Sequence, residues 1–274
     1  MMRITETVKQ LLIINVIFFI GSYIVGPAAT DYLALHAPTS DKFQFWQIIT
    51  HMFMHSRNNI GHIFFNMFAL YSFGVVLEQM WGAKKFIFFY ISCGLGSAAL
   101  HLGVNYFELQ HLLQGVADLN LSSETIHQIL NVSFDDGVKY RSDLFLKEIS
   151  PIIENAGKVS SLTESHFSTL FEAAAFNQRP MLGASGAVYG ILVAFAFMLP
   201  NAELMLLFLP IPIKAKYFVP GLLAIDLFLG LKGNSIFGSG GDGIAHFAHL
   251  GGALVGFMMM WYWKKNQFNN NRWN

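Results

Sequence analysis

Charged residues in this chain are spaced so that long apolar stretches separate them. No Asp, Glu, Lys or Arg occurs between Lys9 and Asp31, and a helix needs about 20 apolar residues to cross a bilayer core about 30 Å thick. Similar gaps run from Arg57 to Glu78, from Lys85 to Glu108, from Arg179 to Glu203 and from Asp242 to Lys264. The pattern therefore predicts five membrane-spanning helices.

A sixth apolar stretch, Tyr217–Leu231, is shorter and contains Asp226. The residues before it, Leu204–Ile213, include Pro210 and Pro212. A proline inside a helix removes a hydrogen bond and clashes with the preceding turn, so we expect an interfacial turn there and not a continuous helix. The predicted count is then six spans.

One segment, Glu108–Arg179, does not fit a membrane, because it carries ten acidic and five basic residues. Within it, Ser142–Asn155 and Ser165–Phe176 mix apolar and charged residues at roughly helical spacing. We predict a partly helical extracytoplasmic insertion between helices 3 and 4. A loosely ordered segment is the alternative that the same composition allows.

The predicted fold is thus an all-α membrane protein with six transmembrane helices. Residues 1–107 hold helices 1–3 and the first outer loop, and residues 108–179 form the insertion. Residues 180–264 hold helices 4–6, and residues 265–274 form a cytoplasmic tail.

Composition supports the membrane assignment and excludes other classes. The chain is 54% hydrophobic and 12% charged, against about 25% charged residues in soluble domains. A net charge of zero gives no basic field for nucleic acid. The single cysteine, Cys93, excludes an intrachain disulfide framework. The first apolar run lacks a small-residue cleavage site, so we expect a retained span and not a signal peptide.

Basic residues predict the orientation, because positive charge stays on the cytoplasmic side. With six spans, the side that holds both termini carries Arg3, Lys9, Lys84, Lys85, Lys214, Lys216, Lys264, Lys265 and Arg272. The short loops on the other side carry Lys42, Arg57, Arg179 and Lys232. We expect a multi-pass protein of the bacterial inner membrane with both termini in the cytoplasm.

A serine lies among small residues at the predicted outer start of the fourth span, in Gly183-Ala184-Ser185-Gly186. If the helix begins there, free backbone N–H groups and the helix dipole favour negative charge beside Ser185. That geometry suits an oxyanion. A serine at a helix-packing contact is the alternative, since small residues are common where membrane helices meet.

The last span carries His249, Gly252 and Gly256 at helical positions i, i+3 and i+7, which lie on one face. Gly186 and Gly190 form a matching small-residue pair beside Ser185. Two such faces can pack backbone against backbone, which would bring His249 level with Ser185 as its base. A histidine that only bonds a neighbouring helix is the alternative.

Other side chains extend this candidate site. His246 lies one turn before His249 and is a second candidate base or a substrate contact. His62 and Asn66, an i, i+4 pair in the second span, face one side and can donate hydrogen bonds to an oxyanion or to another helix. Tyr189 lies four residues after Ser185, where it can stack on His249 or pack as a buried aromatic.

Together these patterns resemble the rhomboid family of intramembrane serine proteases. Gly-x-Ser-Gly, Ala-His-Leu-x-Gly-x-x-x-Gly and His-x-x-x-Asn occur in the family's order and in the expected spans, over roughly Trp46–Trp263. Each motif is weak alone, and the combination is specific.

The resemblance implies a rhomboid bundle and a serine endopeptidase that cleaves transmembrane segments with a Ser185–His249 dyad and no third acidic member. It implies an oxyanion hole from His62, Asn66 and the Ser185 backbone. It further implies that Tyr189 stacks on His249 and that Gly183 and Gly186 shape the nucleophile turn. Glu78 matches a structural glutamate of the family.

The expected partners are single-span membrane-protein substrates and the lipid bilayer, with no nucleic acid, metal or cofactor. The sequence leaves the oligomeric state open. The glycine-rich stretch Lys232–Gly243 is a candidate mobile cap over the water-filled opening. Two features depart from minimal family members, namely the long insertion and the lack of a Trp-Arg pair in the first loop.

Three rival functions need consideration. Histidine pairs at ligand-like spacing would suit a membrane metal enzyme, but such sites use adjacent histidines, and no His-His occurs. A silent relative would bind membrane proteins without cleaving them, but such relatives usually lack the serine or the histidine. A transporter is suggested by Asp226 within a span, without the paired broken helices typical of transporters.

Overall fold

The protein is described here from a computed structural model that covers residues 3–136, 139–206, 209–232 and 244–267. These residues are mostly helical and divide into two compact units. The first unit consists of Met1–Ala34, Ile48–His101 and Met181–Asn274. The second consists of Leu35–Gln47 and Leu102–Pro180.

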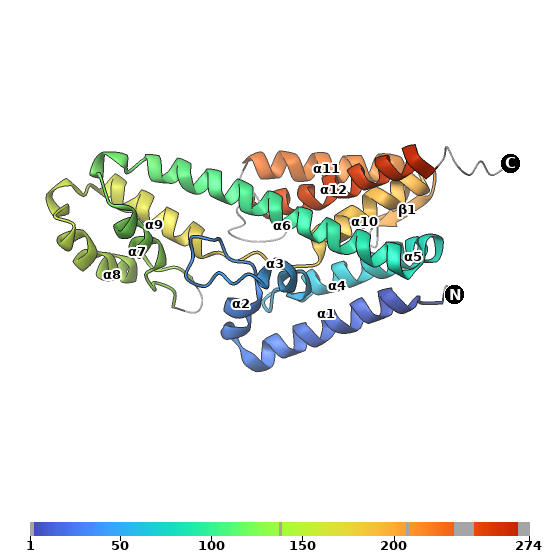
Figure 1. The fold of residues 1–274 in the computed structure, drawn as a ribbon, viewed down its shortest axis with the longest axis horizontal. Helices are drawn as coiled ribbons and strands as arrows, with labels where there is room; N and C mark the ends of the chain where they lie inside the picture. The colour runs from blue at the N-terminus through green and yellow to red at the C-terminus, as the bar shows by residue number, and fades with distance from the viewer. Residues whose placement is uncertain (1–2, 137–138, 207–208, 233–243, 268–274) are drawn as a thin grey trace. The chain divides into compact units, whose positions relative to one another are not determined.

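The first unit is built mainly from apolar helices (Figure 1). Its N-terminal part contains α1 (Glu6–Val25), α2 (Pro27–Leu33), the short α3 (Gln47–Thr50) at the border of the units, and the 3-10 turn η1 (His51–Phe53). A continuous helical stretch follows, made of α4 (Ile60–Ala69), the π-helical η2 (Leu70–Gly74) and α5 (Val75–Trp81). Next comes α6 (Ala83–Gln114), which runs on into the second unit.

The C-terminal part of the first unit contains three more helices and one strand pair. These are α10 (Ser185–Met198), β1 (Glu203–Leu206), β2 (Leu209–Lys214), α11 (Ala215–Lys232) and α12 (Ile244–Gln267). The core of the unit gathers fully buried side chains such as Leu77, Phe86, Phe89 and Tyr90.

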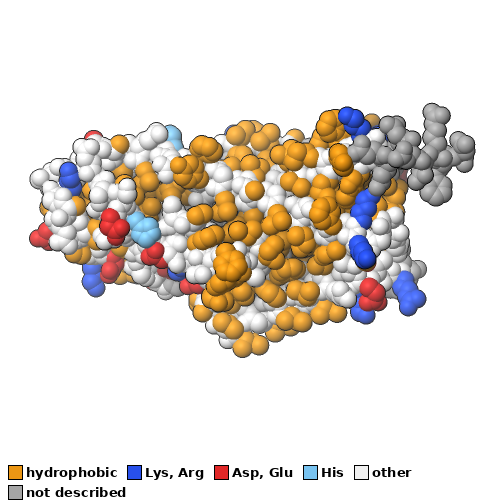
Figure 2. All heavy atoms as spheres, viewed as in Figure 1, with side chains coloured by type: hydrophobic (Ala, Val, Ile, Leu, Met, Phe, Trp, Pro, Cys, Tyr) orange, Lys and Arg blue, Asp and Glu red, His pale blue; other side chains and the backbone are white. Residues whose placement is uncertain are grey.

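The apolar helices indicate an integral membrane protein. Glu6–Val25, Ile60–Trp81 and Ala83–Gln114 are long and apolar enough to cross a bilayer, and α10 is a shorter apolar helix. Figure 2 shows hydrophobic side chains spread over the helices of the first unit, with basic side chains toward the end where α1 begins. Helices of this length and apolar composition are typical of an integral membrane protein, and the exposed apolar surface is consistent with lipid contact. Six spans remain a prediction.

Three elements differ from the sequence-based prediction. The helix of the fourth span has only 14 residues, because the residues before Ser185 form a loop and Leu199 precedes a proline, which disfavours the helical conformation. Helix α6 continues past Glu108 to Gln114. The prolines do exclude a helix over Leu204–Ile213, but the segment forms an antiparallel pair, with Glu203 opposite Lys214.

The second unit is helical, with a core of its own. It contains η3 (Ala117–Leu119), α7 (Ser123–Asn131), α8 (Ser142–Asn155), η4 (Val159–Ser161) and α9 (Glu164–Gln178). Helix α8 has the predicted bounds, and α9 extends the predicted helix at both ends. Phe134 lies against Phe145 and Phe171, with ring centroids 4.9 and 5.4 Å apart. The ordered alternative for this segment is therefore the right one.

The hydrophobic pattern did not predict that Leu35–Gln47 packs within this second unit. Asn131, the last residue of α7, accepts a hydrogen bond from the Asp41 N–H at 2.9 Å and donates one to the Thr39 carbonyl at 3.0 Å. These polar contacts join segments far apart in sequence, so hydrophobic periodicity carries no signal for them.

A buried carboxylate joins the start of α1 to the end of α5. Glu78 is 6% exposed, and its oxygens accept hydrogen bonds from the Thr5 hydroxyl, from the Thr7 N–H at 3.0 Å and from the Val8 N–H at 2.9 Å. The N–H groups of a helix's first turn have no partners within the helix. Glu78 therefore caps α1 from a distant part of the chain.

We expect Glu78→Ala to lower the thermal stability of the purified protein. Each buried donor left without an acceptor costs about 1–3 kcal/mol, so the melting temperature in detergent should fall by several degrees. Glu6→Ala is the matched control, because Glu6 is 78% exposed and only lies 3.9 Å from Lys9. Equal melting temperatures for the two variants would contradict this role of Glu78.

Candidate active site

The loop before α10 is fixed by a glycine that no other residue can replace without strain. Gly183 has a φ of +129°, a conformation that side chains other than glycine rarely adopt. A Cβ atom there would also lie 2.8 Å from His62 Nε2 and 3.5 Å from Ser185 Oγ. The Gly183 N–H donates to the His51 carbonyl at 2.9 Å. Gly183 thus lets the chain turn so that α10 begins at Ser185, as predicted.

Helices α10 and α12 touch through their backbones, which is what the two glycine faces predicted. A Cβ atom at Gly252 would lie 1.9 Å from the carbonyl oxygen of Gly186. A Cβ atom at Gly256 would lie 2.8 Å from the Cα atom of Gly190. No side chain fits in this contact, so the two helix axes lie closer together than bulky residues would allow.

The contact brings a histidine to the serine. His249 Nε2 lies 2.9 Å from Ser185 Oγ, within hydrogen-bond distance. The ring of Tyr189 stacks on the ring of His249, with centroids 4.2 Å apart and an interplanar angle of 11°. Ser185 is the first residue of α10, so its backbone N–H has no acceptor within the helix.

The other candidate base, His246, contacts the His249 ring and Asp226. Its ring packs edge-on against His249, with centroids 6.2 Å apart. Its Nδ1 atom forms a hydrogen bond with Asp226 Oδ1. Of the two histidines considered from the sequence, His249 is the one whose ring contacts Ser185 Oγ.

Asp226 of α11 is the feature that the sequence left without a role. Its Oδ1 atom lies 3.4 Å from His249 Nδ1, on the side of the ring opposite Ser185. The resemblance implies a Ser185–His249 dyad without a third acidic member. In the structure α11 packs against α12 and brings Asp226 beside the His249 ring. Its position inside an otherwise apolar stretch was the only signal in the sequence.

His62 and Asn66 of α4 line the same region from another helix. His62 Nε2 borders Gly183 together with Ser185 Oγ, and His62 Nδ1 accepts from the Ser56 N–H at 3.3 Å. Asn66 is buried and donates to the His62 carbonyl at 2.8 Å. Because an amide carries two hydrogens, this bond leaves Asn66 a second donor.

Comparison with known proteins agrees with this geometry. The family model described as "Rhomboid domain" matches residues 42–114 and 156–266 of the chain, which include every residue of the site described above. The chain belongs to the rhomboid family. Proteins of this family are generally serine intramembrane proteases.

Two curated relatives of this rhomboid protein are fungal. An uncharacterized mitochondrial rhomboid protein of Schizosaccharomyces pombe is 26% identical over 183 residues, which is 65% of this chain and 41% of the relative. Rhomboid protein 1, mitochondrial, of Saccharomyces cerevisiae is 34% identical over 87 residues, which is 31% of this chain and 23% of the relative. The chain thus spans less than half the length of either relative.

Two other features of this rhomboid protein bear on chemistry. Asp226, His246 and His249 offer ligand atoms within 4.8 Å of one another, a set that could hold a metal ion. The predicted cap, Lys232–Gly243, lies outside the described residues apart from Lys232.

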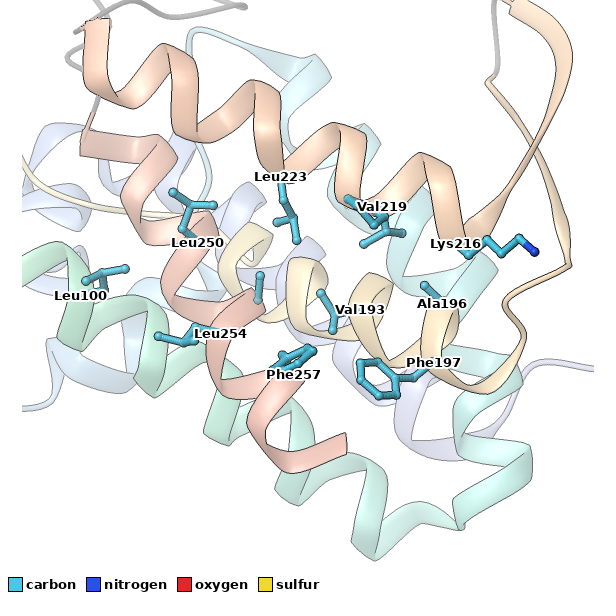
Figure 3. A pocket seen from close by; sticks show the side chains of 12 residues that line it. Leu100, Val193, Ala196, Phe197, Lys216, Val219, Leu223, Leu250, Leu254 and Phe257 are labelled. Carbon is cyan, nitrogen blue, oxygen red and sulfur yellow. The ribbon is translucent and has the colours of Figure 1, made fainter. Parts of the chain in front are cut away.

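A pocket of about 540 Å³ opens between α10, α11 and α12 (Figure 3). Its lining is apolar, with side chains such as Val193, Leu223 and Phe257, and Lys216 lies at one end. Neither Ser185 nor His249 is among the lining residues. The pocket is therefore distinct from the Ser185–His249 contact, and its apolar surface suits contact with lipid or another apolar segment.

We expect Gly252→Ala to disable this rhomboid site more than it affects folding. The added methyl group meets backbone at Gly186, which cannot move aside like a flexible side chain, and overpacking of this kind costs about 1–3 kcal/mol. Separation of α10 from α12 should slow the labelling of Ser185 by a fluorophosphonate probe at least tenfold.

The matched control is Gly103→Ala in α6, where an added Cβ atom meets no described atom within 4 Å. This variant should label like the wild type. Equal labelling rates for Gly252→Ala and Gly103→Ala would contradict the idea that the glycine contact sets the Ser185–His249 distance.

Proposed function

We propose that this rhomboid protein is an intramembrane serine endopeptidase that cleaves the transmembrane segments of single-span membrane proteins. The observation that carries the proposal is the 2.9 Å contact between His249 Nε2 and Ser185 Oγ within a bundle of apolar helices. Family membership supports the protease class. Because the relatives match over less than half their length, the activity and the substrates are proposals for this chain.

In the proposed mechanism, Ser185 Oγ attacks the carbonyl carbon of the scissile peptide bond while His249 Nε2 takes the hydroxyl proton. The Ser185 N–H, His62 and Asn66 donate hydrogen bonds to the resulting oxyanion. The C–N bond then breaks as His249 returns the proton to the leaving amine. A water molecule, activated by His249 in the same way, hydrolyses the acyl-enzyme. These steps use side chains and water, with no metal or cofactor.

For the membrane arrangement we propose six spans, formed by α1, the α4–α5 stretch, α6, α10, α11 and α12. We propose that residues 108–179 form an extracytoplasmic insertion, and the absence of residues 115–155 from the family match supports this. The excess of basic residues on the side of both termini supports a cytoplasmic location for them. We keep the bacterial inner membrane as the proposed bilayer, while both named relatives are mitochondrial.

Substrate choice follows from the chemistry of a site inside the bilayer. A peptide bond within a regular helix has its carbonyl hydrogen-bonded and packed, so attack requires local unwinding. Helices that contain glycine, proline or other weak helix formers unwind at lower cost. We therefore propose that substrates are single-span proteins with such residues near the cleavage position.

Ser185→Ala and His249→Ala should each abolish cleavage while the protein remains folded. Ser185→Ala removes a single oxygen atom, so its melting temperature should stay close to the wild type. His249→Ala removes the ring that stacks on Tyr189 and faces Asp226, so its melting temperature should fall by a few degrees, and its activity is compared per folded enzyme. The measurement compares membrane proteomes of cells that express the wild type or Ser185→Ala, followed by in vitro cleavage of a protein that accumulates in the variant. Continued cleavage by Ser185→Ala would place the nucleophile elsewhere. Absence of fluorophosphonate labelling of folded wild-type protein would favour the silent relative.

His246→Ala should retain cleavage that His249→Ala loses. The reason is that His249, and not His246, contacts Ser185 Oγ. Turnover of the same purified substrate by the two variants tests this directly. If His246→Ala were inactive and His249→Ala active, the general base would be His246.

Asn66→Ala should lower kcat by about 10²–10³-fold, the usual effect of losing one oxyanion donor, with a smaller effect on KM. Asn15→Ala is the matched control, because Asn15 is also buried and also donates to a carbonyl four residues earlier, that of Leu11 at 2.7 Å. Equal kcat values for the two variants would remove Asn66 from the oxyanion hole.

A further inference from the structure

The dyad mechanism does not use the buried carboxylate of Asp226. This residue is 2% exposed and belongs to α11, an otherwise apolar helix. A charged side chain within a membrane span is costly, and such residues pair with other polar groups and mark functional sites. We therefore expect Asp226 to have polar partners and a function.

Its partners include the Tyr189 hydroxyl of α10 and two imidazole rings from α12. Asp226 Oδ1 forms a hydrogen bond with His246 Nδ1, and the same oxygen lies 3.4 Å from His249 Nδ1. An ionised carboxylate can only accept hydrogen bonds, so each of the two Nδ1 atoms must carry a hydrogen to make these contacts. The carboxylate thereby selects one tautomer of His249.

That tautomer is the one which the serine chemistry needs. A neutral imidazole with its hydrogen on Nδ1 has a free lone pair on Nε2. His249 Nε2 is the atom that faces Ser185 Oγ at 2.9 Å, so the serine hydroxyl donates and the ring accepts. With the opposite tautomer, Nε2 would carry a hydrogen and could not take the proton from Ser185.

The Asp226 carboxylate lies on the buried side of the His249 ring. The side chain of Asp226 is 3% exposed, against 21% for that of His249. Tyr189 covers one face of the His249 ring by stacking. The ring is thus held by Asp226 at Nδ1 and by Tyr189 on its face, while its Nε2 edge points to Ser185.

We propose that Asp226 is a positioning residue that holds His249 in the Nδ1-protonated tautomer and stabilises the imidazolium formed during catalysis, so that Asp226, His249 and Ser185 act as a three-member array. This inference rests on the proposed protease function. The proton passes from Ser185 Oγ to His249 Nε2 and then to the leaving amine. Asp226 remains ionised throughout, and its only bond change is a shorter hydrogen bond to the charged ring.

The decisive variant is Asp226→Asn, which keeps the size of the side chain and removes the charge. In a soluble serine protease the corresponding change lowers kcat by about 10⁴-fold. The separation of 3.4 Å is longer than a strong hydrogen bond, so we expect a smaller fall in kcat, about 10²-fold. KM should change by less than about threefold, because the group stabilises the transition state and does not bind substrate.

Combining Asp226→Asn with His249→Ala tests whether Asp226 acts through His249 or has a purely structural role. If Asp226 acts through His249, then adding Asp226→Asn to His249→Ala should cause no further loss of the residual labelling of Ser185 by a fluorophosphonate. The matched control is Glu78→Gln, the same carboxylate-to-amide change at a buried site that caps α1. It should lower the melting temperature and leave kcat per folded enzyme unchanged.

Several results would overturn the inference. These are a kcat of Asp226→Asn within threefold of the wild type, a further loss in the His249→Ala background, or an equal loss of kcat in Glu78→Gln. If Asp226→Asn does not fold, Asp226→Glu and Asp226→Gln form a second pair of equal length, and Glu should label at least tenfold faster than Gln. Equal rates within that pair would also refute the role.

A metal ion held by the same three residues is the competing explanation. Elemental analysis of the purified wild type should find no stoichiometric transition metal. Stoichiometric metal that is lost in Asp226→Asn would overturn the positioning role.

Failure of this inference is distinguishable from failure of the proposed function. If Ser185→Ala still cleaves substrate, the protease assignment fails whatever Asp226 does. If Ser185→Ala is inactive while Asp226→Asn equals the wild type, only the inference fails.

Discussion

The direct backbone contact between α10 and α12 is the constraint on which the rest of the site depends. Lipid offers little hydrophobic drive for two apolar helices to associate, so close packing of small residues must hold them. Gly186 and Gly252 bring the two backbones so near that even one methyl group would overlap with a carbonyl oxygen. The same contact fixes the relative depth of the helices, and so the 2.9 Å separation of Ser185 Oγ and His249 Nε2. The packing of α10 against α12 therefore also sets the geometry of the proposed reaction.

Buried carboxylates serve two different purposes in the first unit. Glu78 accepts hydrogen bonds from three donors at the start of α1 and joins that helix to α5. Asp226 accepts from imidazole rings, which are themselves titratable and belong to the site. A carboxylate surrounded by backbone donors has a fixed environment and stabilises structure. A carboxylate that faces a histidine can instead stabilise the positive charge that the ring gains with a proton, and this is the role proposed for Asp226.

The second unit adds a separate helical body with its own aromatic core of Phe134, Phe145 and Phe171. Its central part, residues 115–155, has no counterpart in the family match, yet the unit also takes in Leu35–Gln47. The early segment and α7 share hydrogen bonds through Asn131. The unmatched residues thus share hydrogen bonds with Thr39 and Asp41, a segment about 90 positions earlier in the chain that also lies outside the family match.

The sequence by itself determined the membrane class and the positions of most helices, and it singled out Ser185 and His249, whose side chains lie within hydrogen-bond distance. Each of these depends on local or periodic information. The signals are charge-free stretches long enough for a bilayer, helical spacing in Ser142–Asn155, and the glycine pairs Gly186/Gly190 and Gly252/Gly256, each four positions apart on one helix face. Tertiary structure alone decided the strand pair before α11, the place of Leu35–Gln47 and the partners of Asp226. A charge within an apolar helix shows that a partner must exist, but which residue it meets depends on how α11 rotates and packs against α12, and no spacing along one helix encodes that.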